Sequence, residues 1–249
     1  MSETVVLISR NGDSADIPCN RGSIDKLDEH VLKMVAFGDI NRKLPNEKEV
    51  HDYCRADIEM ANWGKNYTKS CMTNREVETS RHVTNLFMFS IKKVFTKRCR
   101  SETTRSIFIK AGKCANLAKP DTVQCYDRYT TETEQVNRAK KTIIKNDRHL
   151  IPLICCSYHR FHDCVNEAWA KTNDAEPCNK KAQTELDGYV TETMYDILQY
   201  LCGDYQDNND KCDNLLKRYK DVFTSVKLKS LPKSPLSASN EIFDSIPPL

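Results

Sequence analysis

Apolar residues recur along most of the chain at spacings of three and four positions, which is the period of an amphipathic helix. The pattern is clearest over residues 154–168. At about 100° per residue, one stripe of this segment consists of Ile154, Tyr158, Phe161, Val165 and Ala168. We expect a central helix here that turns this stripe toward a core.

Similar stripes, together with capping residues, predict helices through the rest of the chain. Ser101 can cap one helix, and Asn46 with Glu49 three residues later has the form of a capping box. The expected helices span 23–38, 46–64, 75–98, 101–118, 121–145, 152–172, 178–202 and 211–226. Because 121–145 is the most polar of them, we expect it to pack on the outside.

Glycine and proline usage points to the same fold class. The chain has 7 glycines in 249 residues and no proline over 46–119 or 178–231, which favours helices over a turn-rich β architecture. We therefore predict an all-α bundle of about eight helices in a single domain, residues 19–230. Residues 1–18 are expected to be a disordered N-terminus, and the proline-containing segment 231–249 a disordered tail.

Twelve cysteines, an even number, occur without a close CxxC pair and without zinc-finger spacing. This pattern predicts six disulfides and an oxidising compartment. The apolar run at Val5–Ile8 is too short for the core of a signal peptide. Two explanations are open: a signal was removed and Met1 to about Asp13 is not native, which we favour, or the cysteines are reduced. The cysteines are Cys19, Cys54, Cys71, Cys99, Cys114, Cys125, Cys155, Cys156, Cys164, Cys178, Cys202 and Cys212.

Three of these cysteines lie in the central helix. On a helical wheel Cys155 and Cys164 flank the apolar stripe on either side, and Cys156 lies nearly opposite it. Adjacent cysteines rarely pair with each other, because the small ring strains the peptide. We expect the three sulfurs to leave the helix in three directions and to find three different partners.

The cysteine spacing also indicates an internal repeat. Cys54, Cys71, Cys99 and Cys114 are separated by 17, 28 and 15 residues, and Cys164, Cys178, Cys202 and Cys212 by 14, 24 and 10. Two degenerate halves, about 19–120 and 121–230, would bridge these two sets alike. The remaining four cysteines would then let Cys155 and Cys156 hold the N-terminal segment, through Cys19, and the helix at 121–145, through Cys125.

Charge and hydropathy exclude some partners. The formal net charge of +3 predicts no nucleic-acid partner, and no apolar run approaches the ~20 residues of a membrane span. Basic clusters at 97–100, 140–141 and 217–220 fall on predicted helix surfaces. We expect them to be solvated faces rather than anion sites.

No residue pattern points to catalysis or to a cofactor. The sequence has no GxSxG, no glycine-rich phosphate loop and no HExxH. His159 and His162 lie near Cys156 and Cys164, which could in principle bind zinc. We do not expect a zinc site here, because sulfurs in disulfides cannot be metal ligands. His162 is expected instead to be a partly buried hydrogen-bonding residue. The chain is therefore predicted to have no metal, no cofactor and no enzymatic activity.

One glycosylation sequon, Asn66-Tyr67-Thr68, falls in a segment expected to be a loop, residues 65–73. In a secreted protein such a loop predicts a glycan on Asn66.

The central segment Ile154-Cys155-Cys156, with Phe161 and Cys164, is followed by the helix-flanking Cys178, Cys202 and Cys212. This framework resembles the arthropod 27 kDa hemolymph glycoprotein family and related cysteine-rich helical secreted proteins of invertebrates. The resemblance covers most of residues 19–228. It implies a secreted, disulfide-bonded, all-helical protein of body fluid, saliva or venom, in a family without catalytic residues.

Two functions follow as expectations. The first is an extracellular protein that binds a protein partner through a rigid, stapled surface. The alternative is a carrier that holds a small apolar ligand, a lipid or a hormone, in a cavity between the helices. Residues that could line such a cavity, or simply fill the core, are Phe87, Met88, Phe89, Met194 and Leu198.

Overall fold

The structure is a computed structural model that describes residues 17–35, 37–172, 176–206, 210–228 and 230–246. Every regular element in these ranges is a helix, so the all-α prediction is confirmed. Met1 to Asp13, with the apolar run Val5–Ile8, lies outside the described residues. Within those ranges no helix is both long and apolar enough to cross a membrane.

The described residues form ten α-helices, two more than expected, because the last predicted helix is divided into α8 and α9 and a further helix follows. In chain order they are α1 (Arg21–Met34), α2 (Val50–Cys71), α3 (Glu78–Cys99), α4 (Glu102–Leu117), α5 (Lys119–Ala139), α6 (Leu150–Lys171), α7 (Lys180–Leu201), α8 (Asp210–Arg218), α9 (Lys220–Ser225) and α10 (Leu236–Phe243).

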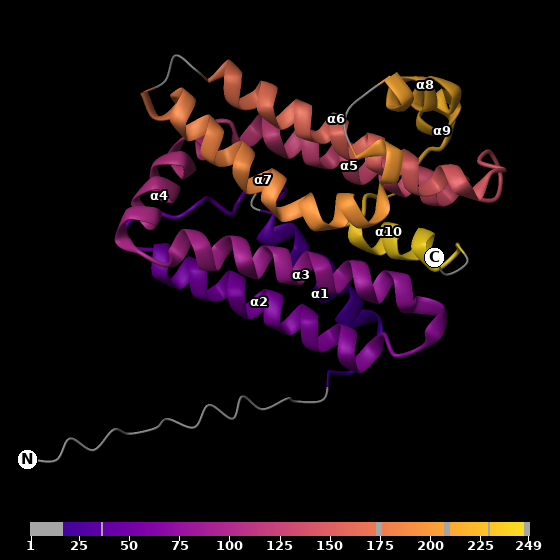
Figure 1. Ribbon diagram of the computed structural model, residues 1–249, viewed down its shortest axis with the longest axis horizontal. Helices are drawn as coiled ribbons and strands as arrows, with labels where there is room; N and C mark the ends of the chain where they lie inside the picture. The colour runs from indigo at the N-terminus through magenta and orange to yellow at the C-terminus, as the bar shows by residue number, and fades with distance from the viewer. Residues whose placement is uncertain (1–16, 36, 173–175, 207–209, 229, 247–249) are drawn as a thin grey trace, which may run out of the picture.

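Two long helix pairs, α2 with α3 and α5 with α6, lie on opposite sides of the molecule, and α7 and α10 lie between them (Figure 1). α1 packs on α2 and α10, and α4 packs on α7 at one end of the bundle. α8 and α9 pack on α6 and α5 at the other end. Apolar residues from all ten helices therefore meet in one central core.

α6 is the predicted central helix, and its whole expected stripe is buried. Its three sulfurs reach three different elements, as predicted. Cys155 pairs with Cys202 at the end of α7, Cys156 with Cys212 in α8, and Cys164 with Cys125 in α5. The other bridges are Cys19–Cys71, Cys54–Cys99 and Cys114–Cys178, so all twelve cysteines are oxidised.

The predicted pairing of equivalent cysteines is wrong. Cys54 pairs with Cys99, but its expected counterpart Cys164 pairs with Cys125 and not with Cys202. Cys19 and Cys125 were expected to pair with Cys155 and Cys156 of α6, and they do not. Cys155 and Cys156 are bridged instead to Cys202, at the end of α7, and to Cys212 in α8.

The helices repeat in a different register from the one that the cysteine spacing indicates. α2 and α6 each have 22 residues, as do α3 and α7. In each pair a bridge joins the first turns of one helix to the end of the next, Cys54–Cys99 in one and Cys155–Cys202 in the other. In this one respect Cys54 is placed like Cys155 and not like Cys164. The packing does not repeat, because α2 lies along α3 whereas α6 lies along α5.

α5 is not an outer helix, in contrast to the expectation from its polarity. Twelve of its residues are buried, among them Thr133 and Gln135. The Thr133 hydroxyl donates to the Tyr129 carbonyl (2.9 Å), and the Gln135 amide donates to the Val226 carbonyl (2.9 Å). These polar side chains can be buried because their hydrogen bonds are made inside the protein.

The segment 231–249 is not a disordered tail over its described part. Residues 236–243 form α10, which buries Leu236, Ile242 and Phe243 against the bundle. A helix of eight residues is marginal in isolation, so its stability must come from this packing. The prolines around this segment predicted disorder, whereas its helix depends on tertiary contacts that the composition does not show.

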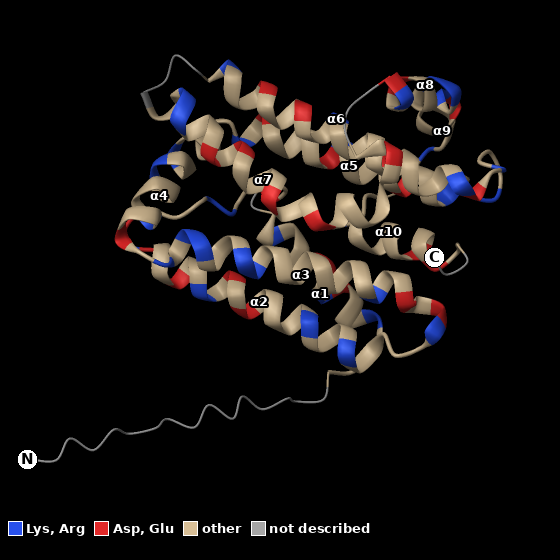
Figure 2. Ribbon diagram, viewed as in Figure 1, with Lys and Arg blue, Asp and Glu red and all other residues tan. Residues whose placement is uncertain are grey.

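The basic cluster at 97–100 is only partly a solvated face. Lys and Arg are interspersed with Asp and Glu along the helices (Figure 2), and the exposed Lys97 pairs with Glu192 at 2.6 Å. Arg98, however, is 4% exposed and pairs with Glu185 (2.8 Å) and Glu192 (3.0 Å). Arg98 is thus an internal tie between α3 and α7.

Candidate functional site

The centre of the bundle contains a cavity of about 110 Å³. Its wall is built from α1, α3, α5, α6, α7 and α10, with Phe37 from the segment after α1. α7 supplies the largest share, through one continuous face of the helix. These residues are Tyr189, Val190, Thr193, Met194, Ile197, Leu198 and Leu201.

The cavity wall is apolar and uncharged. None of the described lining residues is Lys, Arg, His, Asp or Glu. Four phenols, those of Tyr126, Tyr129, Tyr158 and Tyr189, contribute ring surface. Burial raises the pKa of each of them above its ordinary value, so all four are neutral at physiological pH. Such a wall favours an apolar ligand over a charged one.

Five residues were named from the sequence as either cavity lining or core filling. Three of them, Phe87, Met194 and Leu198, line the cavity. Met88 and Phe89 do not, because they lie on other faces of α3. Met88 is buried against Gly64 of α2, so closely that a Cβ added to Gly64 would lie 2.5 Å from the Met88 sulfur. Phe89 is 58% exposed.

The four tyrosines and the wall residues of α10 were not predicted. Tyr158 belonged to the apolar stripe of the central helix, but a stripe identifies a buried face without saying whether that face meets a neighbouring helix or a cavity. The helical spacing of Leu236, Ser239 and Phe243 was the available signal for α10.

The histidines near the α6 cysteines do not form a metal site. The sulfurs of Cys156 and Cys164 are both in disulfides. His159 Nε2 lies 2.9 Å from the Tyr205 carbonyl oxygen, and His162 Nε2 lies 2.9 Å from Asp187 Oδ1. His162 is partly buried and hydrogen-bonded, as predicted. No group of three potential ligands occurs within the described part of the chain.

The sequon does not lie in a loop, because α2 continues through it to Cys71. Asn66 is exposed on the helix surface. Thr68 is fully buried, and its hydroxyl lies 2.8 Å from the Lys65 carbonyl oxygen and 2.7 Å from Asn85 Oδ1, either of which can accept its one proton. Glycosylation of Asn66 stays a prediction, now for a helical and not a loop position.

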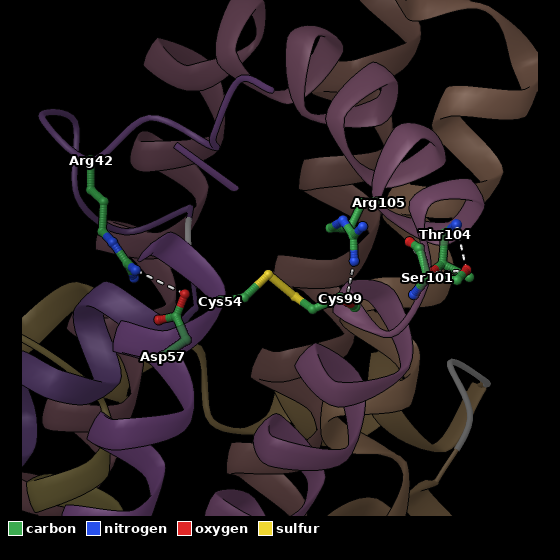
Figure 3. The surroundings of a disulfide bond; sticks show 7 residues. All are labelled: Arg42, Cys54, Asp57, Cys99, Ser101, Thr104 and Arg105. Atoms are coloured by element: carbon green, nitrogen blue, oxygen red, sulfur yellow. Dashed lines mark hydrogen bonds and ion pairs between the residues drawn. A yellow bond between two sulfur atoms is a disulfide. The ribbon is translucent and has the colours of Figure 1, made fainter. Parts of the chain in front are cut away.

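A buried ion pair lies beside the Cys54–Cys99 bridge (Figure 3). Arg42 Nη2 is 2.8 Å from Asp57 Oδ2, and the Arg42 guanidinium also covers the Tyr53 ring at 4.2 Å. Asp57 is fully buried, and its Oδ1 atom has no hydrogen-bond partner. Burial raises the pKa of the Asp57 carboxyl to about 7, although Arg42 offsets part of the rise.

We expect Asp57 to make stability fall as pH rises. The folded-state pKa of about 7 lies above the ordinary value of 3.8, so the folded chain binds this proton more tightly than the unfolded chain. The corresponding stability is complete below about pH 4 and is lost as pH rises through about 7. Relative to Asp57→Asn, the wild-type unfolding free energy should fall by up to about 1.4 kcal/mol per pH unit in that window.

Urea denaturation between about pH 4 and pH 8 measures this difference. Asp52→Asn is the matched control, since Asp52 is on the same helix but exposed. Its profile should run parallel to that of the wild type. A parallel profile for Asp57→Asn as well would show that Asp57 titrates alike in the folded and unfolded chains.

Comparison of the chain with protein-family models, curated proteins and solved structures found no match. The resemblance to the arthropod hemolymph glycoprotein family therefore stays a prediction that depends on the cysteine framework.

Proposed function

We propose that this protein is a secreted, non-enzymatic carrier that holds a small apolar ligand in its central cavity. The observation that carries the proposal is the apolar cavity itself, because protein cores are ordinarily packed with few voids larger than a water molecule. An apolar cavity of about 150 Å³ stays dry and binds benzene or xenon. A cavity of about 110 Å³ is of similar size and has similar walls.

The six disulfides support secretion. Disulfides form and persist in oxidising compartments, and the described cysteines are all bridged. A stapled bundle also suits a carrier, because the bridges hold most of the cavity wall in place when no ligand fills it.

The second candidate, a protein-binding surface, is favoured by exposed aromatic side chains. Phe89 on α3 and Tyr195 on α7 are 58% and 56% exposed, and Tyr200 is also exposed. Scattered exposed apolar residues are common on protein surfaces, however, so this observation weighs less than the cavity. A partner captured through Phe89, and lost in Phe89→Ala, would favour this candidate.

Benzene binding tests the carrier. Benzene at about ten times its dissociation constant should stabilise the wild type by about 1.4 kcal/mol, measured by thermal or urea unfolding. Thr193→Phe places a ring inside the cavity and should abolish the benzene effect. Thr191→Phe is the matched control, because Thr191 lies two residues away on the exposed side of α7 and should leave binding intact.

Equal protection of Thr193→Phe and the wild type would show that benzene does not bind in this cavity. Protein from a eukaryotic secretion host should also release a stoichiometric apolar molecule into organic solvent, detected by mass spectrometry. A clean extract together with no benzene effect would contradict the carrier and leave the binding surface.

A further inference from the structure

α10 differs from the rest of the cavity wall in how it is fastened. All six bridges lie between Cys19 and Cys212. Every described lining residue on the other elements falls inside at least one disulfide loop. The lining residues Pro235, Leu236, Ser239 and Phe243 come after the last cysteine. This part of the wall is therefore held by non-covalent contacts alone.

α10 is seated as an amphipathic helix in a groove. It packs on α5 and α3, and to a lesser extent on α1 and α6. α7 and α10 both line the cavity, and both lie between the two long helix pairs (Figure 1). Met194, Leu198 and Leu201 on α7 line the cavity and are only partly buried, so the cavity lies close to the surface at these residues. Displacement of α10 would remove its part of the cavity wall without disturbing any bridge.

Hydrogen bonds at both ends of α10 hold it in the groove. At its start, the Ser234 and Ser237 hydroxyls donate to the two carboxylate oxygens of Asp28 on α1. At its end, the Ser80 hydroxyl on α3 lies within hydrogen-bond distance of the Asn240 carbonyl (3.0 Å) and of the Asp244 carboxylate, and it can donate its one proton to either. Asp28 and Ser80 are buried, so these contacts are specific and shielded from water.

We propose that α10 is the movable wall of the cavity: it undocks from the stapled bundle as a unit, apolar ligands enter and leave through the opening, and Asp28 is the contact that keeps it closed. The ligand route rests on the function proposed above. The undocking of α10 does not, because it concerns the fastening of the helix and not the contents of the cavity. Local opening of this kind is expected of segments with the weakest tertiary fastening.

Hydrogen exchange and benzene exchange test the proposal on the full, oxidised chain. Asp28→Ala removes the acceptor of both serine hydroxyls and should raise amide exchange in 236–243 by about a hundredfold. Ser237→Ala removes one of the two bonds and should raise it by about tenfold. Amides of α3, α6 and α7 should be unchanged in both variants. Benzene release, measured by NMR, should accelerate by the same factors.

Asp25→Ala is the matched control, because Asp25 lies one turn away on α1 with an exposed side chain. It should change neither rate. Faster exchange in α10 with unchanged benzene release would overturn the ligand route. Equal acceleration of exchange in α3, α6 and α7 would overturn the independent opening of α10. No benzene binding to the wild type would overturn the carrier function, while the exchange data would still decide whether α10 opens alone.

Discussion

Reduction of the six disulfides is expected to unfold the protein at room temperature. The bridges close separations of 39 to 64 residues, and each removes chain entropy worth about 4 kcal/mol from the unfolded state. Several such contributions together exceed the net stability of about 5–15 kcal/mol of an ordinary domain. The helical circular dichroism and the cooperative thermal transition should both disappear under excess reductant.

A single outer bridge provides the control for this result. Cys19–Cys71 fastens only the segment before α1 to the end of α2, and Cys19 is exposed. Cys19→Ala with Cys71→Ala should lower the unfolding free energy by about 2–4 kcal/mol and keep a cooperative transition. If the chain with all its thiols free still unfolded cooperatively, packing alone would account for the fold.

Tyr189→Ala should lower the free energy of unfolding by about 3–5 kcal/mol. The Tyr189 ring is buried at the junction of several helices and meets Phe37 (5.7 Å) and Phe95 (5.8 Å) edge-on. The Arg98 guanidinium lies over it at 5.3 Å, and its hydroxyl donates to the Met34 carbonyl (2.6 Å). Truncation removes these contacts and leaves the buried carbonyl without this donor.

Chemical denaturation of three variants measures this loss of stability and separates the contribution of the ring from that of the hydroxyl. Tyr195→Ala makes the same substitution on the exposed side of α7 and should cost about 0.5 kcal/mol or less. Tyr189→Phe removes only the hydroxyl and should cost about 1–3 kcal/mol. Because Tyr189 lines the cavity, its truncation also enlarges the ligand site, and benzene should recover part of the loss. A cost equal to that of Tyr195→Ala would show that the ring is not part of the core.

The sequence alone determined the features that depend on nearby residues. The period of 3.6 residues located seven of the helices, and the α6 stripe is buried throughout. The Ser101 cap appears as a capping box with Thr104, and the Asn46 and Glu49 side chains bond each other's backbone amides. The angular positions of three cysteines on α6 predicted three separate partners. These are consequences of helix geometry, which local sequence specifies.

Only the tertiary structure decided which surfaces meet. α5 was expected to be an outer helix because many of its residues are polar. The sequence does not show that a polar side chain such as Gln135 has a buried hydrogen-bond partner, the Val226 carbonyl. α10 looked like a tail because a short helix depends on the groove that receives it. The bridges follow distances in the fold, so cysteine spacing suggested the wrong equivalence for Cys54.

The cavity was the feature that could be predicted least from the sequence. Phe87 and Met194 were named as possible lining residues, but Phe89, which was named with them and has the same side chain as Phe87, lies on the surface. A cavity is the space left where six helices and a connecting segment fail to fill the volume between them. Its existence depends on the relative placement of elements up to two hundred residues apart, and no local pattern records that placement.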